Sequence, residues 1–266
     1  MDQRKLIEHV INSFKNADDL KSNINDDILN LDGATGTKTR HLYNNLCSMS
    51  NTRYLEIGLW TGSSFCSSIF KNNIKCVGID NWCEFFKRED LGEKTSQEIF
   101  HERLNKFKGD NEVQIIEQDC FKVDINKLNK FNIFLYDGHH SYECTYKSLE
   151  YYYDCLDDEF IFIIDDWNSN PIQEATYDII NKSFDLLYEK TIFTDYYKDI
   201  IYKDQERIDR SIAYVNKKVN NNRKSKLLKK LESQRIKHKV SIDNNYSKDD
   251  WWNGIAVFVL KKKKFN

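Results

Sequence analysis

Five short apolar runs, separated by segments with helical periodicity, constrain the fold of this chain more than any other feature. Each run has the length of a strand, and each helical segment lies between two runs. We therefore expect parallel strands in one sheet, with helices on both faces. The runs cover residues 53–58, 75–80, 112–119, 131–137 and 159–166. The helical segments between them cover roughly 63–71, 94–108, 141–155 and 171–182.

Two amphipathic segments precede the first run, at 2–16 and 37–49. Their apolar residues recur with the spacing of a helix, so they predict an N-terminal helical cap over residues 1–50. The rest of the chain, 51–266, is expected to form one domain, because no linker rich in proline or glycine divides it.

Two further apolar runs lie at 184–193 and 253–263, and we expect them to pair as antiparallel strands. The charged segment between them, about 195–250, is too long for a hairpin loop and predicts a helical insertion. The predicted fold class is α/β. We expect a Rossmann-like, doubly wound, mostly parallel seven-stranded sheet with an antiparallel last strand and a helical insertion before it.

Four of the first five runs end in, or are followed by, aspartate. Ligands of such sheets bind outside the carboxyl ends of the strands, where these carboxylates are expected to gather. A single aspartate there can simply cap the next helix, so the argument depends on the whole set. The aspartates are Asp80, Asp119, Asp137 and Asp165.

A glycine-containing turn follows the first run and contains Glu56, Gly58 and Gly62. Glycine allows the backbone to approach a ligand closely. A dinucleotide site requires G-x-G-x-x-G to bind a pyrophosphate, and this chain lacks that spacing. An acid ahead of the first glycine suits a ligand with a sulfonium and an ammonium group instead. Asp80, at the end of the next strand, can accept hydrogen bonds from ribose hydroxyls.

The segments LEIGLWTG, GIDNW and QDCF resemble the cofactor motifs of class I methyltransferases, and the resemblance covers about residues 37–183 well. It implies S-adenosylmethionine as the cofactor and places Asp119 near the adenine amino group. The implied cofactor-binding residues are Glu56, Gly58, Thr61, Gly62, Asp80, Asn81, Trp82, Asp119, Cys120 and Asp137.

Three carboxylates, of Asp137, Asp165 and Asp166, are expected to meet at the ends of the fourth and fifth strands. Such a group repels itself unless a cation joins it, and oxygen ligands favour Mg²⁺ or a similar divalent ion. Imidazole titrates near neutral pH, so His140 or its neighbour His139 is suited to remove a proton from a hydroxyl. The alternative is that these residues only cap the helices that follow.

The segments YDGHHSYE and IDDWN are similar to those of metal-dependent small-molecule O-methyltransferases, especially the macrocin O-methyltransferase and methyltransferase-24-like group that modifies sugars. The resemblance implies that Asp137, Asp165 and Asp166 bind the metal. By register it also implies that His140 is the general base, with Asp137 beside it in the catalytic group. Asn168 is expected to support the metal ligands or contact the substrate.

Aromatic residues gather in loops at the same edge, where they are expected either to stack on a ligand or to pack the loops. They are Trp60, Trp82, Phe85, Phe86, Trp167, Trp251 and Trp252. Within the insertion, residues 217–239 carry ten lysines or arginines and one glutamate. This segment can be a solvated helix, a phosphate-binding surface, or a lid or arm for homo-oligomer formation.

The leading functional hypothesis is O-methylation of a small-molecule or glycan acceptor. RNA methylation is the alternative, because of the basic segment, although a net charge of −2 gives no general attraction to nucleic acid. A binding module without chemistry is a third reading. No apolar run approaches the roughly 18 residues of a membrane span. Seven scattered cysteines without a CxxC pair, and no visible signal peptide, are typical of a cytoplasmic protein.

Overall fold

One seven-stranded sheet forms the centre of the protein, with the strand order β3-β2-β1-β4-β5-β7-β6. The computed structural model describes residues 3–83, 94–194, 212, 228 and 246–264. The strands are β1 (Arg53–Ile57), β2 (Lys75–Asp80), β3 (Glu112–Glu117), β4 (Phe131–Tyr136), β5 (Leu156–Asp165), β6 (Phe184–Ile192) and β7 (Ile255–Lys262).

Strands β1 to β5 pair in parallel, and β7 runs antiparallel to both of its neighbours, β5 and β6. The strand order reverses between β1 and β4. At such a point a doubly wound sheet opens a crevice for ligands. The predicted fold class is thus confirmed. The predicted helical character of the insertion, about 195–250, falls almost entirely outside the described residues.

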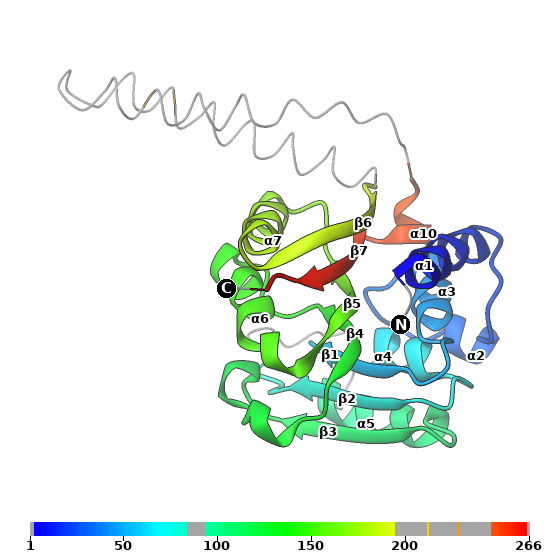
Figure 1. The fold of residues 1–266 in the computed structure, drawn as a ribbon. Helices are drawn as coiled ribbons and strands as arrows, with labels where there is room; N and C mark the ends of the chain where they lie inside the picture. Colours follow the sequence, from blue (N-terminus) through cyan, green and yellow to red (C-terminus); the bar gives the residue numbers. More distant parts are fainter. Residues whose placement is uncertain (1–2, 84–93, 195–211, 213–227, 229–245, 265–266) are drawn as a thin grey trace.

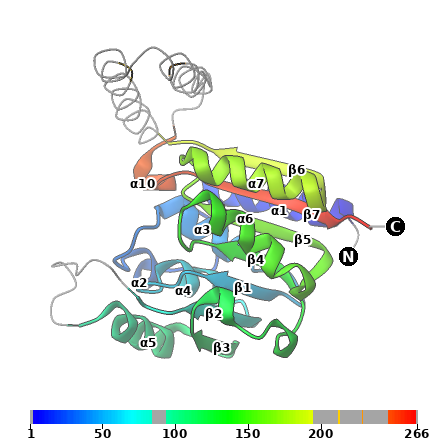
Figure 2. The ribbon, with the colours of Figure 1, turned by 90° about the vertical axis from the view of Figure 1, so that its left-hand side faces the viewer.

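Helices cover both faces of the sheet (Figures 1 and 2). The apolar side chains of one group of helices share a core with one face of the sheet, and those of a second group share a core with the other face. The first group is α1 (Gln3–Asp18), α3 (Thr37–Leu46), α4 (Ser63–Ile69) and α5 (Ser96–Phe107). The second is α6 (Tyr142–Tyr151) and α7 (Asn170–Ser183), while α2 (Asp26–Leu29) and α10 (Lys248–Trp251) are short.

The N-terminal helices belong to the layer that covers the sheet. Leu6, Val10 and Phe14 of α1 are buried in the same core as Ile161 of β5 and Val257 of β7. The helices that connect the parallel strands leave this part of the sheet uncovered, so α1 supplies the apolar partner that it needs. The core is therefore continuous across residue 50.

The boundary between α6 and β5 differs from the sequence-based prediction. The helix expected over 141–155 ends at Tyr151, and β5 begins at Leu156, before the apolar run at 159–166. Long-range pairing explains the difference, because Leu156 pairs with Phe131 of β4. Glu159 enters the strand opposite Lys261 of β7, with which it forms an ion pair of 3.2 Å. Tertiary pairing here overrides the local polar pattern.

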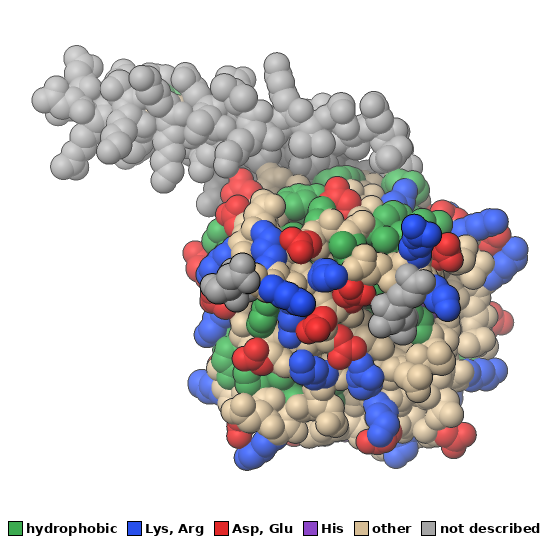
Figure 3. Space-filling model, in the orientation of Figure 1, with side chains coloured by type: hydrophobic (Ala, Val, Ile, Leu, Met, Phe, Trp, Pro, Cys, Tyr) green, Lys and Arg blue, Asp and Glu red, His purple; other side chains and the backbone are tan. Residues whose placement is uncertain are grey.

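The described surface carries a mixture of charges. On the face shown in Figure 3, lysines and arginines alternate with aspartates and glutamates. Among the described residues, no helix is long and apolar enough to cross a bilayer.

Candidate active site

A cavity of about 760 Å³ opens at the carboxyl edge of the parallel strands, around the point where the strand order reverses. Its walls come from the loops that follow β1 to β5, so the edge that the sequence singled out is also where the structure is hollow. The cavity brings together most of the residues predicted to bind cofactor, metal or proton. These are Gly58, Asp80, Asn81, Asp119, Cys120, Asp137, His139, His140, Asp165 and Asp166.

Four predicted cofactor residues, Glu56, Thr61, Gly62 and Trp82, are not among the described residues that line this cavity. Thr61 is fully buried, and its hydroxyl bonds to the carbonyl of Asp32 at 3.4 Å. The indole of Trp82 donates to the carbonyl of Trp60 at 2.9 Å and packs on the ring of Phe100. These residues support the cavity wall from behind.

Gly58 is required by a close approach of two backbones. Its φ is +90°, and a Cβ there would lie 1.9 Å from the carbonyl oxygen of Asp137. The amide of Asp137 donates to the carbonyl of Ile57 at 2.8 Å, which holds the two strand ends together. Only glycine fits this contact, because it has no Cβ and tolerates positive φ.

Asp80 organises the two loops beside it. Its carboxylate accepts hydrogen bonds from the amides of Leu59 at 2.7 Å, Trp60 at 2.9 Å and Trp82 at 2.8 Å. Both tryptophans have φ of +44°, a conformation that costs a side-chain-bearing residue energy and needs such fixing. Carboxylate oxygens have further lone pairs, so the predicted contact of Asp80 with ribose stays a prediction.

Glu56 does not supply the negative charge that the sequence argument assigned to it. Its carboxyl group is fully buried and accepts hydrogen bonds from the hydroxyls of Tyr54 and Ser64. Burial, reinforced by the nearby carboxylates of Asp137 and Asp80 and only partly offset by the two hydroxyl bonds, raises the pKa of Glu56 to about 8. The group is therefore mostly protonated at neutral pH.

Two carboxylates and one imidazole converge in the cavity. The Nε2 atom of His140 lies 2.8 Å from Oδ2 of Asp166 and 3.5 Å from Oδ1 of Asp137. Ligand atoms of these three residues all lie within 4.8 Å of one another, a group that could hold a metal ion. The two carboxylates suit a divalent cation of the Mg²⁺ or Mn²⁺ type with open positions, and the imidazole of His140 lies beside them.

The charges of this cluster are interdependent. Burial alone would lower the pKa of His140, but its hydrogen bonds to Asp137 and Asp166 raise that pKa to about 11. Burial raises the pKa of Asp137 to about 6. Burial also opposes ionisation of Asp166, but His140 and Asn253 together hold the pKa of Asp166 below its usual range. Without a metal, the imidazolium of His140 balances the carboxylates.

Asp165 stands apart from the group of described ligand atoms, although it was predicted as a metal ligand. Its Oδ2 accepts from the hydroxyl of Tyr43 at 3.1 Å, and its Oδ1 accepts from the amide of Asp166 at 2.8 Å. Burial and the nearby carboxylates raise its pKa well above the usual range. The structure thus places His140, and not Asp165, beside the other two predicted metal ligands.

Residues that the sequence analysis did not assign to the site come from the two ends of the chain. Ala34 lines the cavity, and Tyr43 of α3 reaches Asp165. The amide of Asn253 donates to Asp166 at 2.7 Å. The two ends also approach each other at Gly36, where a Cβ would lie 2.3 Å from the carbonyl oxygen of Asp250.

The aromatic residues separate into two groups. Trp60 and Trp252 line the cavity, as the ligand-stacking alternative requires. Trp167 and Trp251 are buried and pack in the apolar cores, as the packing alternative requires. The predictions for Phe85, Phe86 and the basic segment 217–239 lie outside the described residues.

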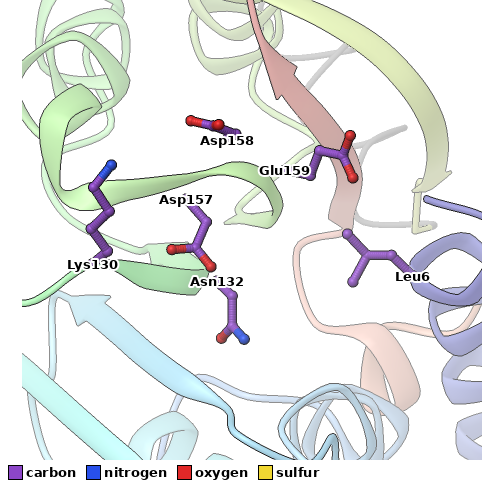
Figure 4. A pocket seen from close by; sticks show the side chains of 6 residues that line it. All are labelled: Leu6, Lys130, Asn132, Asp157, Asp158 and Glu159. Atoms are coloured by element: carbon purple, nitrogen blue, oxygen red, sulfur yellow. The ribbon is translucent and has the colours of Figure 1, made fainter. Parts of the chain in front are cut away.

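A second cavity, of about 480 Å³, lies at the opposite edge of the sheet, beside the start of β5 (Figure 4). Three of its polar side chains already have partners. Asn132 accepts from the amide of Arg53 at 2.8 Å, Asp157 pairs with the guanidinium of Arg53, and Glu159 binds Gln3 at 2.6 Å. These contacts tie the amino ends of the strands together and serve the fold.

Part of the chain is similar to a known protein family. Residues 55–167 match the model of a family described as a methyltransferase domain. No curated protein matches the chain. Among solved structures, TrmN from Thermus thermophilus is 9% identical with a TM-score of 0.48. That alignment covers 89% of this chain and 52% of TrmN, so the chain spans about half the length of that protein.

Two further solved structures contain S-adenosyl-L-homocysteine. The Podospora anserina methyltransferase PaMTH1 is 10% identical, with a TM-score of 0.42 over 99% of this chain and 89% of that one. A SAM-dependent methyltransferase from Geobacter sulfurreducens is 14% identical, with a TM-score of 0.44 over 96% of this chain and 98% of that one.

The family match runs from β1 to the loop after β5, which is the part of the chain that supplies the strand-end acids and most of the cavity wall. This part of the chain, residues 55–167, is therefore similar to a methyltransferase domain.

We predict that Gly58→Ala destabilises the protein far more than Gly109→Ala. Both glycines have positive φ, which costs an alanine about 1–2 kcal/mol. Only Gly58 also faces a backbone atom, which adds about 1–3 kcal/mol or more of overpacking. Urea unfolding measures both variants, and equal losses would contradict the close-contact explanation.

We also predict that Glu56→Gln changes how stability depends on pH. A pKa that is higher in the folded state than in the unfolded state stabilises the fold fully below about pH 4.5 and loses that effect as pH rises towards 8. Cofactor-free wild-type protein should thus lose a few kcal/mol of unfolding free energy, relative to Glu56→Gln, between pH 5 and 8. The exposed Glu143→Gln is the control. Parallel curves for wild type and Glu56→Gln would show that Glu56 does not titrate in this range.

Proposed function

We propose that the protein is an S-adenosylmethionine-dependent O-methyltransferase, assisted by a divalent cation, which methylates a hydroxyl group of a sugar or a glycosylated small molecule. The observation that carries the proposal is the convergence of Asp137, His140 and Asp166 in the same cavity as Gly58 and Asp80. A methyl donor and a hydroxyl acceptor must meet in one such space.

The cofactor half of the cavity suits an adenosine with a charged amino-acid tail. Ile57, Ile79 and Phe121 provide apolar contact surface for a purine, and Asp119 and Asp80 provide acceptors at the ends of β3 and β2. A volume of about 760 Å³ leaves room beside the cofactor for part of an acceptor. When bound, the cofactor supplies an electrophilic methyl group on sulfur.

Asp137 and Asp166 would hold the cation, and His140 lies within reach of the same position. A bound divalent cation lowers the pKa of a coordinated hydroxyl group and fixes its oxygen. It also supplies the positive charge that otherwise comes from the His140 imidazolium. His140 is then free to lose its proton and to accept one from the acceptor hydroxyl.

The resemblance of YDGHHSYE and IDDWN to the macrocin O-methyltransferase group supports a sugar as the acceptor. The main alternative is methylation of RNA, which the basic segment 217–239 favours. Two parallel reactions distinguish the acceptor classes. Both contain the protein and radiolabelled cofactor; one contains sugar glycosides and the other RNA, and the label transferred to each acceptor is measured. Label in RNA alone would overturn the proposed acceptor.

We predict that Asp166→Asn reduces methyl transfer to sugar glycosides by more than about 100-fold, because a ligand of the cation is lost. Chelation of divalent cations should abolish activity in the wild type. Asp110→Asn, in an exposed loop, is the matched control and should keep wild-type kcat. Full activity of Asp166→Asn in the presence of chelator would remove the metal from the proposal.

We predict that His140→Gln lowers kcat by about 10²–10⁴-fold, the usual contribution of a general base. His139→Gln should have little effect, because only the His140 ring lies against both carboxylates. Both variants should bind S-adenosylhomocysteine with wild-type affinity, as measured by calorimetry. A larger loss for His139→Gln would assign the base to that neighbour.

A further inference from the structure

The two oxygens of the Asp166 carboxylate have different partners. Oδ2 faces Nε2 of His140 at 2.8 Å, in the cluster that could hold a metal ion. Oδ1 accepts a hydrogen bond of 2.7 Å from the side-chain amide of Asn253. Asp166 also has φ of +54°, an unfavourable conformation for a residue with a side chain, so the surrounding structure must hold it in place.

Asn253 is itself fixed against the turn that contains Asp166. The backbone carbonyl of Asn253 accepts a hydrogen bond from the backbone amide of Asn168 at 3.0 Å. The backbone carbonyl of Gly254 accepts one from the backbone amide of Trp167 at 3.3 Å. Gly254 has φ of +80°, and a Cβ there would lie 2.7 Å from Oδ1 of Asn168. The segment before β7 and the turn after β5 are therefore in close contact.

Asn168 secures this contact from the other side. Its side chain is fully buried, donates to the hydroxyl of Thr194 at 2.9 Å and accepts from the amide of Thr194 at 3.2 Å. The hydroxyl of Thr194 in turn donates to the carbonyl of Trp252 at 2.8 Å. Three segments that are distant in the sequence thus hold the Asn253 amide at one fixed place beside Asp166.

We infer that Asn253 is a positioning residue that reserves one oxygen of Asp166 for the cation and keeps the other oxygen away from it. This inference rests on the proposed metal site. A carboxylate restricted to one ligand oxygen suits small octahedral cations such as Mg²⁺ or Mn²⁺. Ca²⁺ accepts six to eight ligands and readily takes both oxygens of one carboxylate. Asn253 therefore favours the small cations over Ca²⁺.

The test measures cation binding directly, with Mn²⁺ and Ca²⁺ as probes in calorimetric titrations of the full-length chain. Asn253→Ala should raise the Kd for Mn²⁺ by about 10–100-fold, the usual effect of removing a group that orients a metal ligand. The Kd for Ca²⁺ should rise less, because both oxygens of Asp166 become available to it. Asn129→Ala, at an exposed position, is the matched control and should leave both values unchanged.

The possible outcomes are distinct. If the wild type binds Mn²⁺ and Asn253→Ala binds it equally well, the inference is wrong and the metal site stands. If the wild type binds no divalent cation, both fail. Binding of S-adenosylhomocysteine reports whether Asn253→Ala is folded. If Asn253→Ala is not folded, Asn253→Ser provides the same test, because the shorter serine side chain cannot reach Asp166. An equal loss of affinity for Mn²⁺ and Ca²⁺ would indicate a general distortion and would overturn the positioning role.

Discussion

The contact between the ends of β1 and β4 is the constraint on which the rest of the site depends. At Gly58 the chain leaves β1 with positive φ and lies directly against the carbonyl of Asp137. No side chain fits between these two backbones. The contact brings the glycine turn beside Asp137, a member of the cluster with His140 and Asp166. Gly58, Asp137 and His140 therefore line one cavity, because two neighbouring strands end at the same level.

Much of this arrangement could be predicted from the sequence, because it follows from local patterns. The apolar runs and the helices between them specify a doubly wound sheet, and the position of each aspartate after its strand specifies the edge where it lies. Asp80, Asp119, Asp137 and Asp166 all line the cavity for this reason. Their register follows from parallel pairing, which aligns strand ends that are far apart in the sequence.

The remaining parts of the site depend on contacts that have no local signature. Tyr43 reaches Asp165 across 122 positions of the chain, and Asn253 reaches Asp166 across 87. Neither residue stands in a motif, and neither spacing repeats. The direction of a side chain could not be predicted from the sequence either. Glu56 follows the pattern of a cofactor-binding acid, but its side chain points into the core, where Tyr54 and Ser64 enclose it. The sequence specifies the residue type, while the packing of α4 on β1 decides what its charge can be.

Charge balance explains why the structure gathers so many acids without a basic residue for each. Burial raises the pKa of Glu56 and of Asp165, so these carboxyl groups resist ionisation and add little repulsion. Asp137 and Asp166 both face the imidazole of His140, which can offset their charge. Of the three carboxylates expected at this site, those of Asp137 and Asp166 lie against His140, while the carboxyl group of Asp165 accepts a hydrogen bond from Tyr43. If the proposed cation binds here, it and a protonated His140 would serve the same two carboxylates. Binding of the cation would then favour loss of the proton from His140, which would link occupation of the site to the proposed role of His140 as general base.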